Sequence, residues 1–179
     1  FNNITQKNRN TLLWRDDSVD GMKTGHTEAA GYCLVASSVR DGMRLISIVL
    51  GTASDKARIA ESQRLLNYGY RFFKTRRVYA AGEQISEARI WMGQSESLGL
   101  GVAEDLYLTL PRDAFDSLQS TIEVADYIRA PMRIGQKLGR SVLMADNQVV
   151  GEVPLLALQK IEQGGIFLRM KHSIQRYFQ

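Results

Sequence analysis

The chain has 179 residues, 44 % hydrophobic and 23 % charged, which is enough for one medium domain or for part of a domain joined to a small one. It has no initiator methionine, no signal peptide and no apolar run that could span a bilayer, so we expect Phe1 to lie inside a longer protein. The net charge is +4, but no basic cluster is interleaved with aromatic residues, so nucleic-acid binding is not expected.

The charge is unevenly distributed along the chain. Residues 1–75 carry 11 Lys and Arg against 7 Asp and Glu, residues 76–163 carry 9 against 12, and residues 164–179 carry 3 basic residues and no acid. The resulting net charges of +4, −3 and +3 favour an anionic ligand near the first segment and an anionic surface near the last.

Three antiparallel strands are predicted first. Tyr32–Val39 and Arg44–Leu50 are rich in Leu, Ile and Val, and Asp41-Gly42 between them is a hairpin signal. Lys23–Thr27 would form the strand before them. As the outermost strand, it would leave backbone donors and acceptors free for a ligand.

A helix is predicted from Asp55 to Phe73, capped by Ser54 or Thr52. Its apolar residues recur at spacings of seven, four and three, and they are Ile59, Leu66, Tyr70 and Phe73. This face should cover the sheet, which gives an α+β arrangement.

From Arg76 onward the pattern changes to short strands separated by turns, typical of a small all-β sandwich. The candidate strands are Arg77–Ala81, Ala88–Met92, Asp105–Leu110, Thr121–Val124, Ser141–Ala145 and Gln148–Glu152. Asp146-Asn147 is predicted to be a turn, and so are Gly99 and Gly101. We therefore divide the chain into residues 1–75, an all-β domain 76–163 and a tail 164–179.

The tail has the pattern of an amphipathic helix. At about 100° per residue, one side would carry Ile166, Phe167, Met170, Ile174, Tyr177 and Phe178. The other side would carry Arg169, His172 and Arg176. An apolar face opposite a basic face suits a helix lying on an anionic membrane surface, although packing on the β-domain would need the same apolar stripe.

No metal or cofactor is expected. Cys33 is the single cysteine, His26 and His172 are far apart in sequence, and no glycine-rich loop leads into a helix with Lys-Ser or Lys-Thr.

The stretch Val19–Thr27 contains the chemistry that stands out. The Lys23 ammonium can pair with a carboxylate, and the Thr24 hydroxyl can donate a hydrogen bond to the same group. Gly25 has no side chain, so another chain can approach its backbone closely. Lys-Thr-Gly is also a motif of penicillin-binding proteins and class A β-lactamases.

The residues around this triplet resemble the serine D-alanyl-D-alanine carboxypeptidases, the low-molecular-mass penicillin-binding proteins that trim cell-wall peptides. The segments that carry the resemblance are Asn8-Arg9-Asn10, Leu12-Leu13-Trp14, Val19–Thr27, Ala30-Gly31-Tyr32 and Arg44–Gly51. It is specific over the first third, weaker beyond about Thr75, and returns near the C-terminus. In the family an all-β domain follows the catalytic domain, so the resemblance implies that residues 1–75 are the C-terminal part of a penicillin-binding/β-lactamase-like transpeptidase domain.

The resemblance implies roles for six residues. The Lys-Thr-Gly strand would bind the substrate peptide as an added strand, Lys23 and Thr24 facing its terminal carboxylate and Gly25 lying against it. Lys23 would also help proton movement, and the His26 N–H would form half of the oxyanion hole. Arg9 and Arg58 match positions near the carboxylate site. The placement of Arg9 is less secure, because residues 14–19 are one residue shorter than in members of the family.

Two family motifs are missing. No serine here has a lysine three residues later, and no Ser-x-Asn occurs, so both motifs would lie upstream and this chain alone should be inactive. The whole protein would remove the terminal D-alanine from peptidoglycan pentapeptides through an acyl-serine and bind β-lactams. It would lie in the periplasm, attached peripherally to the inner membrane through the tail.

Two alternatives remain. A β-lactamase is disfavoured by the all-β region, because such enzymes end soon after the helix that covers the sheet. A non-catalytic envelope binding module would keep the same fold, and the presence or absence of the two serine motifs upstream would distinguish it from the enzyme.

Overall fold

The computed structural model describes residue 3 and residues 5–165, and the chain divides into two compact units at Thr75 and Arg76. The predicted amphipathic tail lies outside the described residues, apart from Gly164 and Gly165. No helix in the described part is long and apolar enough to cross a membrane.

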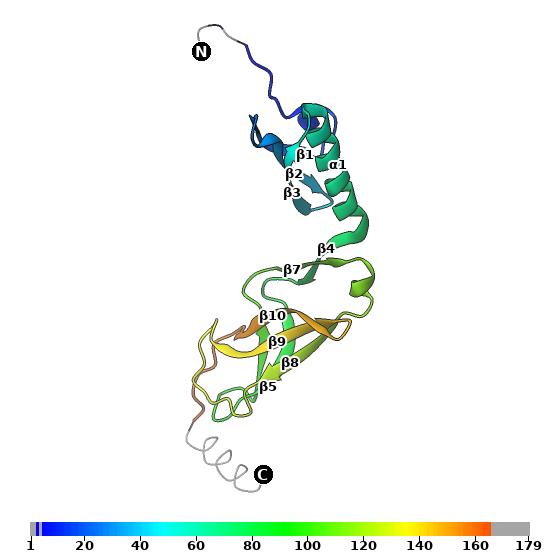
Figure 1. The fold of residues 1–179 in the computed structure, drawn as a ribbon. Helices are drawn as coiled ribbons and strands as arrows, with labels where there is room; N and C mark the ends of the chain where they lie inside the picture. The colour runs from blue at the N-terminus through cyan, green and yellow to red at the C-terminus, as the bar shows by residue number, and fades with distance from the viewer. Residues whose placement is uncertain (1–2, 4, 166–179) are drawn as a thin grey trace. The chain divides into compact units, whose positions relative to one another are not determined.

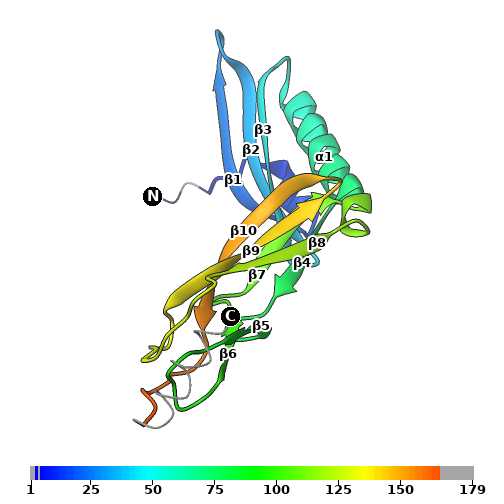
Figure 2. The same ribbon diagram turned by 90° about the horizontal axis from the view of Figure 1, so that it is seen from below.

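The first unit is a three-stranded sheet covered by a helix (Figures 1 and 2). Its elements are η1 (Thr11–Trp14), β1 (Val19–Thr27), β2 (Gly31–Arg40), β3 (Met43–Thr52) and α1 (Asp55–Phe72). The strands are antiparallel in the order β1-β2-β3, so the predicted order is confirmed and the Lys-Thr-Gly strand is outermost among the described residues.

The predicted helix is also confirmed, with Ser54 rather than Thr52 as its cap. The Ser54 hydroxyl accepts a hydrogen bond from the Ala57 N–H at 3.2 Å. The Thr52 hydroxyl instead donates to the Tyr32 carbonyl oxygen, and Phe73 already belongs to the next strand. Ile59 and Leu66 of the helix are each 1 % exposed.

One apolar core joins α1, the sheet and the N-terminal segment of this unit. Its buried members are Leu12, Val19, Leu34, Ala36, Ile59 and Leu66. Burying side chains of this size contributes roughly 1.5–3 kcal/mol each, which fixes α1 against the face of the sheet that carries Leu34 and Ala36.

The start of β1 is held by a polar cluster. The Arg40 guanidinium donates to the Asp16 carboxylate at 2.6 Å and to the Ser18 hydroxyl at 3.0 Å. Burial raises the pKa of Asp16, but hydrogen bonds from Ser18 and Arg40 outweigh it and leave that pKa below its usual value. These bonds join the segment before β1 to the end of β2.

The second unit is β-rich, as predicted. The strand β4 (Phe73–Tyr79) crosses the boundary into this unit. The elements that follow are β5 (Gln84–Arg89), β6 (Ser97–Gly101), β7 (Leu106–Pro111), η2 (Asp113–Phe115), β8 (Gln119–Val124), β9 (Lys137–Ala145) and β10 (Gln148–Ala157). They form a five-stranded sheet in the order β5-β6-β10-β9-β8 and a two-stranded sheet of β4 and β7. The predicted Asp146-Asn147 turn joins β9 to β10, and both of its residues have positive φ.

The prediction of turns at Gly99 and Gly101 is wrong. Both residues lie in β6, a strand that the sequence analysis missed. A Cβ atom at Gly101 would come within 2.2 Å of the Glu83 carbonyl oxygen, and one at Gly99 within 2.7 Å of the Gln84 side chain. These glycines therefore permit a close approach of neighbouring chain segments.

Because both apolar cores of the second unit consist of residues between 78 and 161, we predict that residues 73–163 fold as an isolated polypeptide. It should give a β-type circular dichroism spectrum and one cooperative thermal transition. Lack of a cooperative transition would mean that the β-region depends on the first unit.

Candidate functional site

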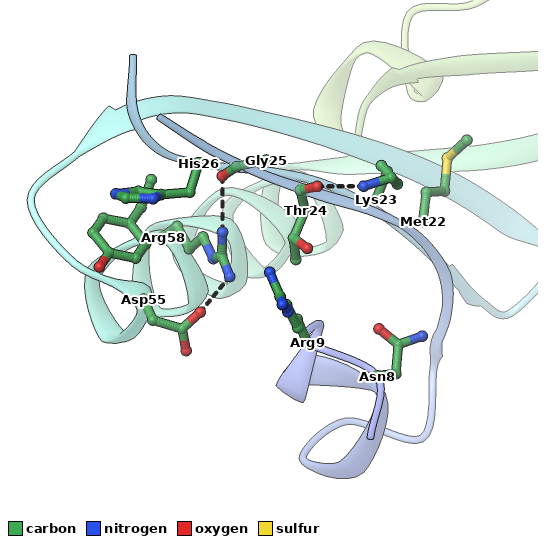
Figure 3. Close-up of a pocket in the computed structure, with 10 residues that line it drawn as sticks. Asn8, Arg9, Met22, Lys23, Thr24, Gly25, His26, Asp55 and Arg58 are labelled. Carbon is green, nitrogen blue, oxygen red and sulfur yellow. Dashed lines mark hydrogen bonds and ion pairs between the residues drawn. The ribbon is translucent and has the colours of Figure 1, made fainter. Parts of the chain in front are cut away.

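A cleft of about 650 Å³ lies along β1 in the first unit (Figure 3). All six residues singled out from the sequence line it, namely Arg9, Lys23, Thr24, Gly25, His26 and Arg58. The lining is completed by Asn8, Met22, Tyr32 and Asp55, which the sequence analysis did not select. Three of these ten residues are Lys or Arg and one is acidic, so the cleft favours an anionic ligand.

Asn10 fixes the segment that brings Asn8 and Arg9 to the cleft. Its side chain is 1 % exposed, donates to the Gly21 carbonyl oxygen at 3.0 Å and accepts from the Leu12 N–H at 3.2 Å. The segment before η1 is thereby fastened to β1. Arg9 itself is exposed and forms no ion pair within the described part of the chain.

Arg58 is the buried cation of the site, at 3 % exposure. From α1 it donates through Nη1 to the Gly25 carbonyl oxygen at 2.9 Å and to the Cys33 carbonyl oxygen at 3.2 Å. Its Nη2 pairs with the Asp55 carboxylate one helical turn earlier. The guanidinium therefore joins the helix to facing residues of β1 and β2, as Figure 3 shows for Gly25 and Asp55.

Lys23 and Thr24 occupy the middle of β1. The Lys23 side chain is exposed, and its ammonium donates to the Thr24 carbonyl oxygen at 2.7 Å. An ammonium has three donors, so two more are available to a ligand. Within the described residues the Thr24 hydroxyl has no hydrogen-bond partner.

His26 lies at the end of the cleft beside Tyr32. The two ring centroids are 3.9 Å apart with planes inclined at 38°, and Tyr32 is the cross-strand partner of His26 in the β1–β2 register. The Arg58 guanidinium lies 5.5 Å from the centroid of the same Tyr32 ring. From the sequence, Tyr32 could have been recognised as a cleft residue only if its pairing with His26 in the sheet were known. Asp55 could have been recognised as the partner of Arg58 from its position three residues earlier in the predicted helix.

No group of His, Cys, Asp and Glu suited to a metal ion occurs among residues 5–165. The groups that the cleft offers to a ligand are its cations, the Thr24 hydroxyl and the edge of β1. A strand edge with adjacent cations can pair with an extended peptide and hold its carboxylate.

Comparison with known protein families gives matches in both units of the chain. The family model described as the penicillin-binding protein 5 C-terminal domain matches residues 73–163, and the D-alanyl-D-alanine carboxypeptidase model matches residues 1–54. The chain therefore belongs to the D-alanyl-D-alanine carboxypeptidases of the penicillin-binding protein 5 type.

Individual relatives show the same relationship. D-alanyl-D-alanine carboxypeptidase DacA of Escherichia coli K12 is 40 % identical over 99 % of this chain and 45 % of its own length. DacA of Haemophilus influenzae is 41 % identical over 93 % of this chain and 43 % of its own length. The crystal structure of penicillin binding protein 5 from Haemophilus influenzae superposes with a TM-score of 0.81 at 38 % identity, covering 91 % of this chain and 48 % of that one. The chain thus spans less than half the length of these relatives.

The bonds of Arg58 predict a large structural effect of its removal. Arg58→Met would leave two backbone carbonyls and the Asp55 carboxylate without their donor, which should lower the free energy of unfolding by roughly 2–4 kcal/mol. The measurement is denaturant unfolding of the full-length protein.

Arg64→Met is the matched control, because Arg64 forms the same i,i+3 pair with Glu61 on the surface of α1. That change should cost less than about 1 kcal/mol. Equal losses for the two variants would contradict a structural role for Arg58.

Proposed function

We propose that this chain provides the substrate-binding wall of a serine-type D-alanyl-D-alanine carboxypeptidase, which removes the terminal D-alanine from peptidoglycan peptides and is acylated by β-lactams. The observation that carries the proposal is the cation-lined cleft beside the open edge of β1. The nucleophilic serine and its lysine partner would come from sequence outside this chain, since neither family motif occurs in it.

In this proposal the substrate peptide adds to β1 as a further strand. Gly25 suits that role, because a Cβ atom there would meet only Cys33, at an ordinary contact distance of 3.8 Å. Packing within the unit does not require a glycine at this position. A bare backbone would instead let the substrate lie closely against the strand.

The substrate carboxylate would be held at the middle of β1. The Thr24 hydroxyl and the two remaining Lys23 donors can bond its oxygens. Arg9, in the segment before η1, can donate two parallel hydrogen bonds to the same carboxylate from its planar guanidinium. Arg58 would act on the carboxylate through its charge, since its Nη atoms already hold Gly25, Cys33 and Asp55.

The chemical step would take place at the carbonyl of the scissile bond. The His26 backbone N–H, with the N–H of the serine outside this chain, would stabilise the oxyanion of the tetrahedral intermediate. The serine oxygen would attack the carbonyl carbon and give its proton to the lysine groups, which are Lys23 and the lysine outside this chain. The C–N bond would then break, and D-alanine would leave with a proton returned by these lysines. Water would then hydrolyse the acyl-serine ester and restore the hydroxyl.

Lys23→Ala should slow acylation of the full-length protein by a labelled penicillin by about 10²-fold or more, because a contact made in the transition state is lost. The second-order rate constant of acylation is the measurement. Lys56→Ala is the control, because Lys56 is an exposed lysine of α1 that does not line the cleft. A wild-type rate for Lys23→Ala would remove this lysine from the mechanism.

We further propose that the protein is attached to the inner membrane from the periplasmic side through residues 164–179. Full-length protein should co-sediment with vesicles containing phosphatidylglycerol, and deletion of residues 166–179 should reduce binding strongly, because three basic and several apolar residues are lost. Equal binding with and without the segment, or binding insensitive to lipid charge and salt, would contradict membrane attachment through the tail and would favour packing of the tail on the β-domain.

A further inference from the structure

Three segments of the second unit meet at one of its ends. Isolated bridges pair Trp91 with Arg129, Met132 with Ile161 and Gly93 with Gln163. In Figures 1 and 2 the green, yellow and orange loops that contain these residues lie side by side. The Gly164 N–H donates to the Met92 carbonyl oxygen at 2.9 Å, so the chain is fastened to this end just before residue 166.

The segment 127–134 presents an alternating pattern at this end. Its inward side chains are buried and apolar, and they are Ile128, Ala130 and Met132. Its exposed side chains form a stripe of mixed character, and they are Tyr127, Arg129, Pro131, Arg133 and Ile134. Ile134 is 70 % exposed, the largest exposure among the large hydrophobic side chains of the described residues. We call these five residues the 127–134 stripe.

Tyr127, at the start of the stripe, packs beside the Trp91 ring. The Arg89 guanidinium lies 4.1 Å from the centroid of the Trp91 ring, and the Trp91 and Tyr127 ring centroids are 6.2 Å apart. Trp91 is 7 % exposed, so it holds Arg89 and Tyr127 in place. Tyr side chains are common at membrane–water interfaces, where the ring lies at the level of the lipid headgroups, and neighbouring Arg side chains can bind the lipid phosphates.

Positive charge gathers at this end of an otherwise acidic domain. Residues 89–97, 125–137 and 158–163 carry five basic and three acidic residues, whereas the remainder of 76–163 carries four basic and nine acidic residues. Of the basic residues at this end, Lys160 pairs with Glu162. Arg129 and Arg133 form no ion pair with any residue in the described part of the chain, and neither does the exposed Lys137 just after the stripe. Two of the unpaired cations of this end therefore belong to the stripe.

We propose that the 127–134 stripe is a docking surface for an anionic lipid membrane, and that it contacts the bilayer beside the point where the tail begins. The proposal rests on the attachment proposed above. Arg129 and Arg133 can bond lipid phosphates with their planar forks, while Tyr127 and Ile134 enter the interfacial region. The tail segment that follows adds three basic residues and no acid. Two contacts on one domain restrict its orientation more than a single helix can.

The first test removes the charge of the stripe and leaves the tail intact. R129Q/R133Q in the full-length protein should bind phosphatidylglycerol-containing vesicles roughly ten- to thirtyfold more weakly, since each basic residue near an anionic surface adds about a factor of five. R15Q/K56Q removes the same charge from exposed positions of the first unit and should bind like the wild type. Equal affinities for the two double variants would overturn the proposal.

The second test asks for direct contact. Cys33→Ser removes the single cysteine of these 179 residues, and any cysteine in the remainder of the full-length protein is replaced by serine as well. In that background Ile134→Cys is labelled with an environment-sensitive dye. Its emission should shift to shorter wavelength with phosphatidylglycerol vesicles and stay constant with phosphatidylcholine vesicles. Val149→Cys is the control, because Val149 is 62 % exposed next to the turn at the other end of the β9–β10 hairpin.

The two proposals fail in different ways in these experiments. Labelled Ile134→Cys protein that binds vesicles without a spectral shift overturns docking of the stripe, even when penicillin acylation is normal. Suppose instead that the Cys33→Ser protein carrying the label shows the spectral shift but is not acylated by penicillin. That result would count against the proposed enzymatic function and would still support docking of the stripe. An emission shift at position 149 as large as the shift at position 134 would also contradict the proposal that the stripe is the part of the domain that contacts the membrane.

Discussion

The arrangement of the cleft depends on one buried guanidinium. Arg58 is nearly inaccessible to solvent, and its charge is compensated by Asp55 on the same helix and by two backbone carbonyls on different strands. Gly25 and Cys33 face each other in the β1–β2 register, so one side chain binds both members of a strand pair. An edge strand has hydrogen bonds to a neighbour on one side alone, and here a helix side chain supplies the missing support.

A second buried polar side chain acts in the same way on the other side of the Lys-Thr-Gly triplet. Asn10 donates to the Gly21 carbonyl oxygen, whereas Arg58 binds Gly25 four residues further along β1. Lys23 and Thr24 lie between these two points. Buried polar groups carry a large penalty when a partner is removed, so both contacts resist displacement. Backbone positions on the strand are thus fixed while the side chains between them remain available to a ligand.

Much of the fold follows from local patterns, and the failures are instructive. The strands around Asp41-Gly42 and the helix after Ser54 were predictable because alternation, turn residues and a cap lie close together in sequence. β6 was missed because Gly99 and Gly101 resemble turn residues, whereas contacts with Glu83 and Gln84 explain them. The six residues selected by type and motif line one cleft, and their roles in binding stay a prediction. Their partners were not predictable, because hydrogen bonds such as that of Arg58 to Cys33 depend on tertiary packing.

The basic residues of this chain show that bonding state, rather than residue type, determines what a cation can do. In the cleft, Arg58 has both Nη atoms engaged and supports the strand, whereas Arg9 and Lys23 keep donors for a ligand. At the end of the second unit, Arg89 lies over Trp91, while Arg129 carries charge without an acidic partner in the described part of the chain. A guanidinium that is already hydrogen-bonded gains little from a new anion, because forming the new bond requires loss of an old one. The exposed and unpaired cations are therefore the ones through which each surface can bind an anionic partner.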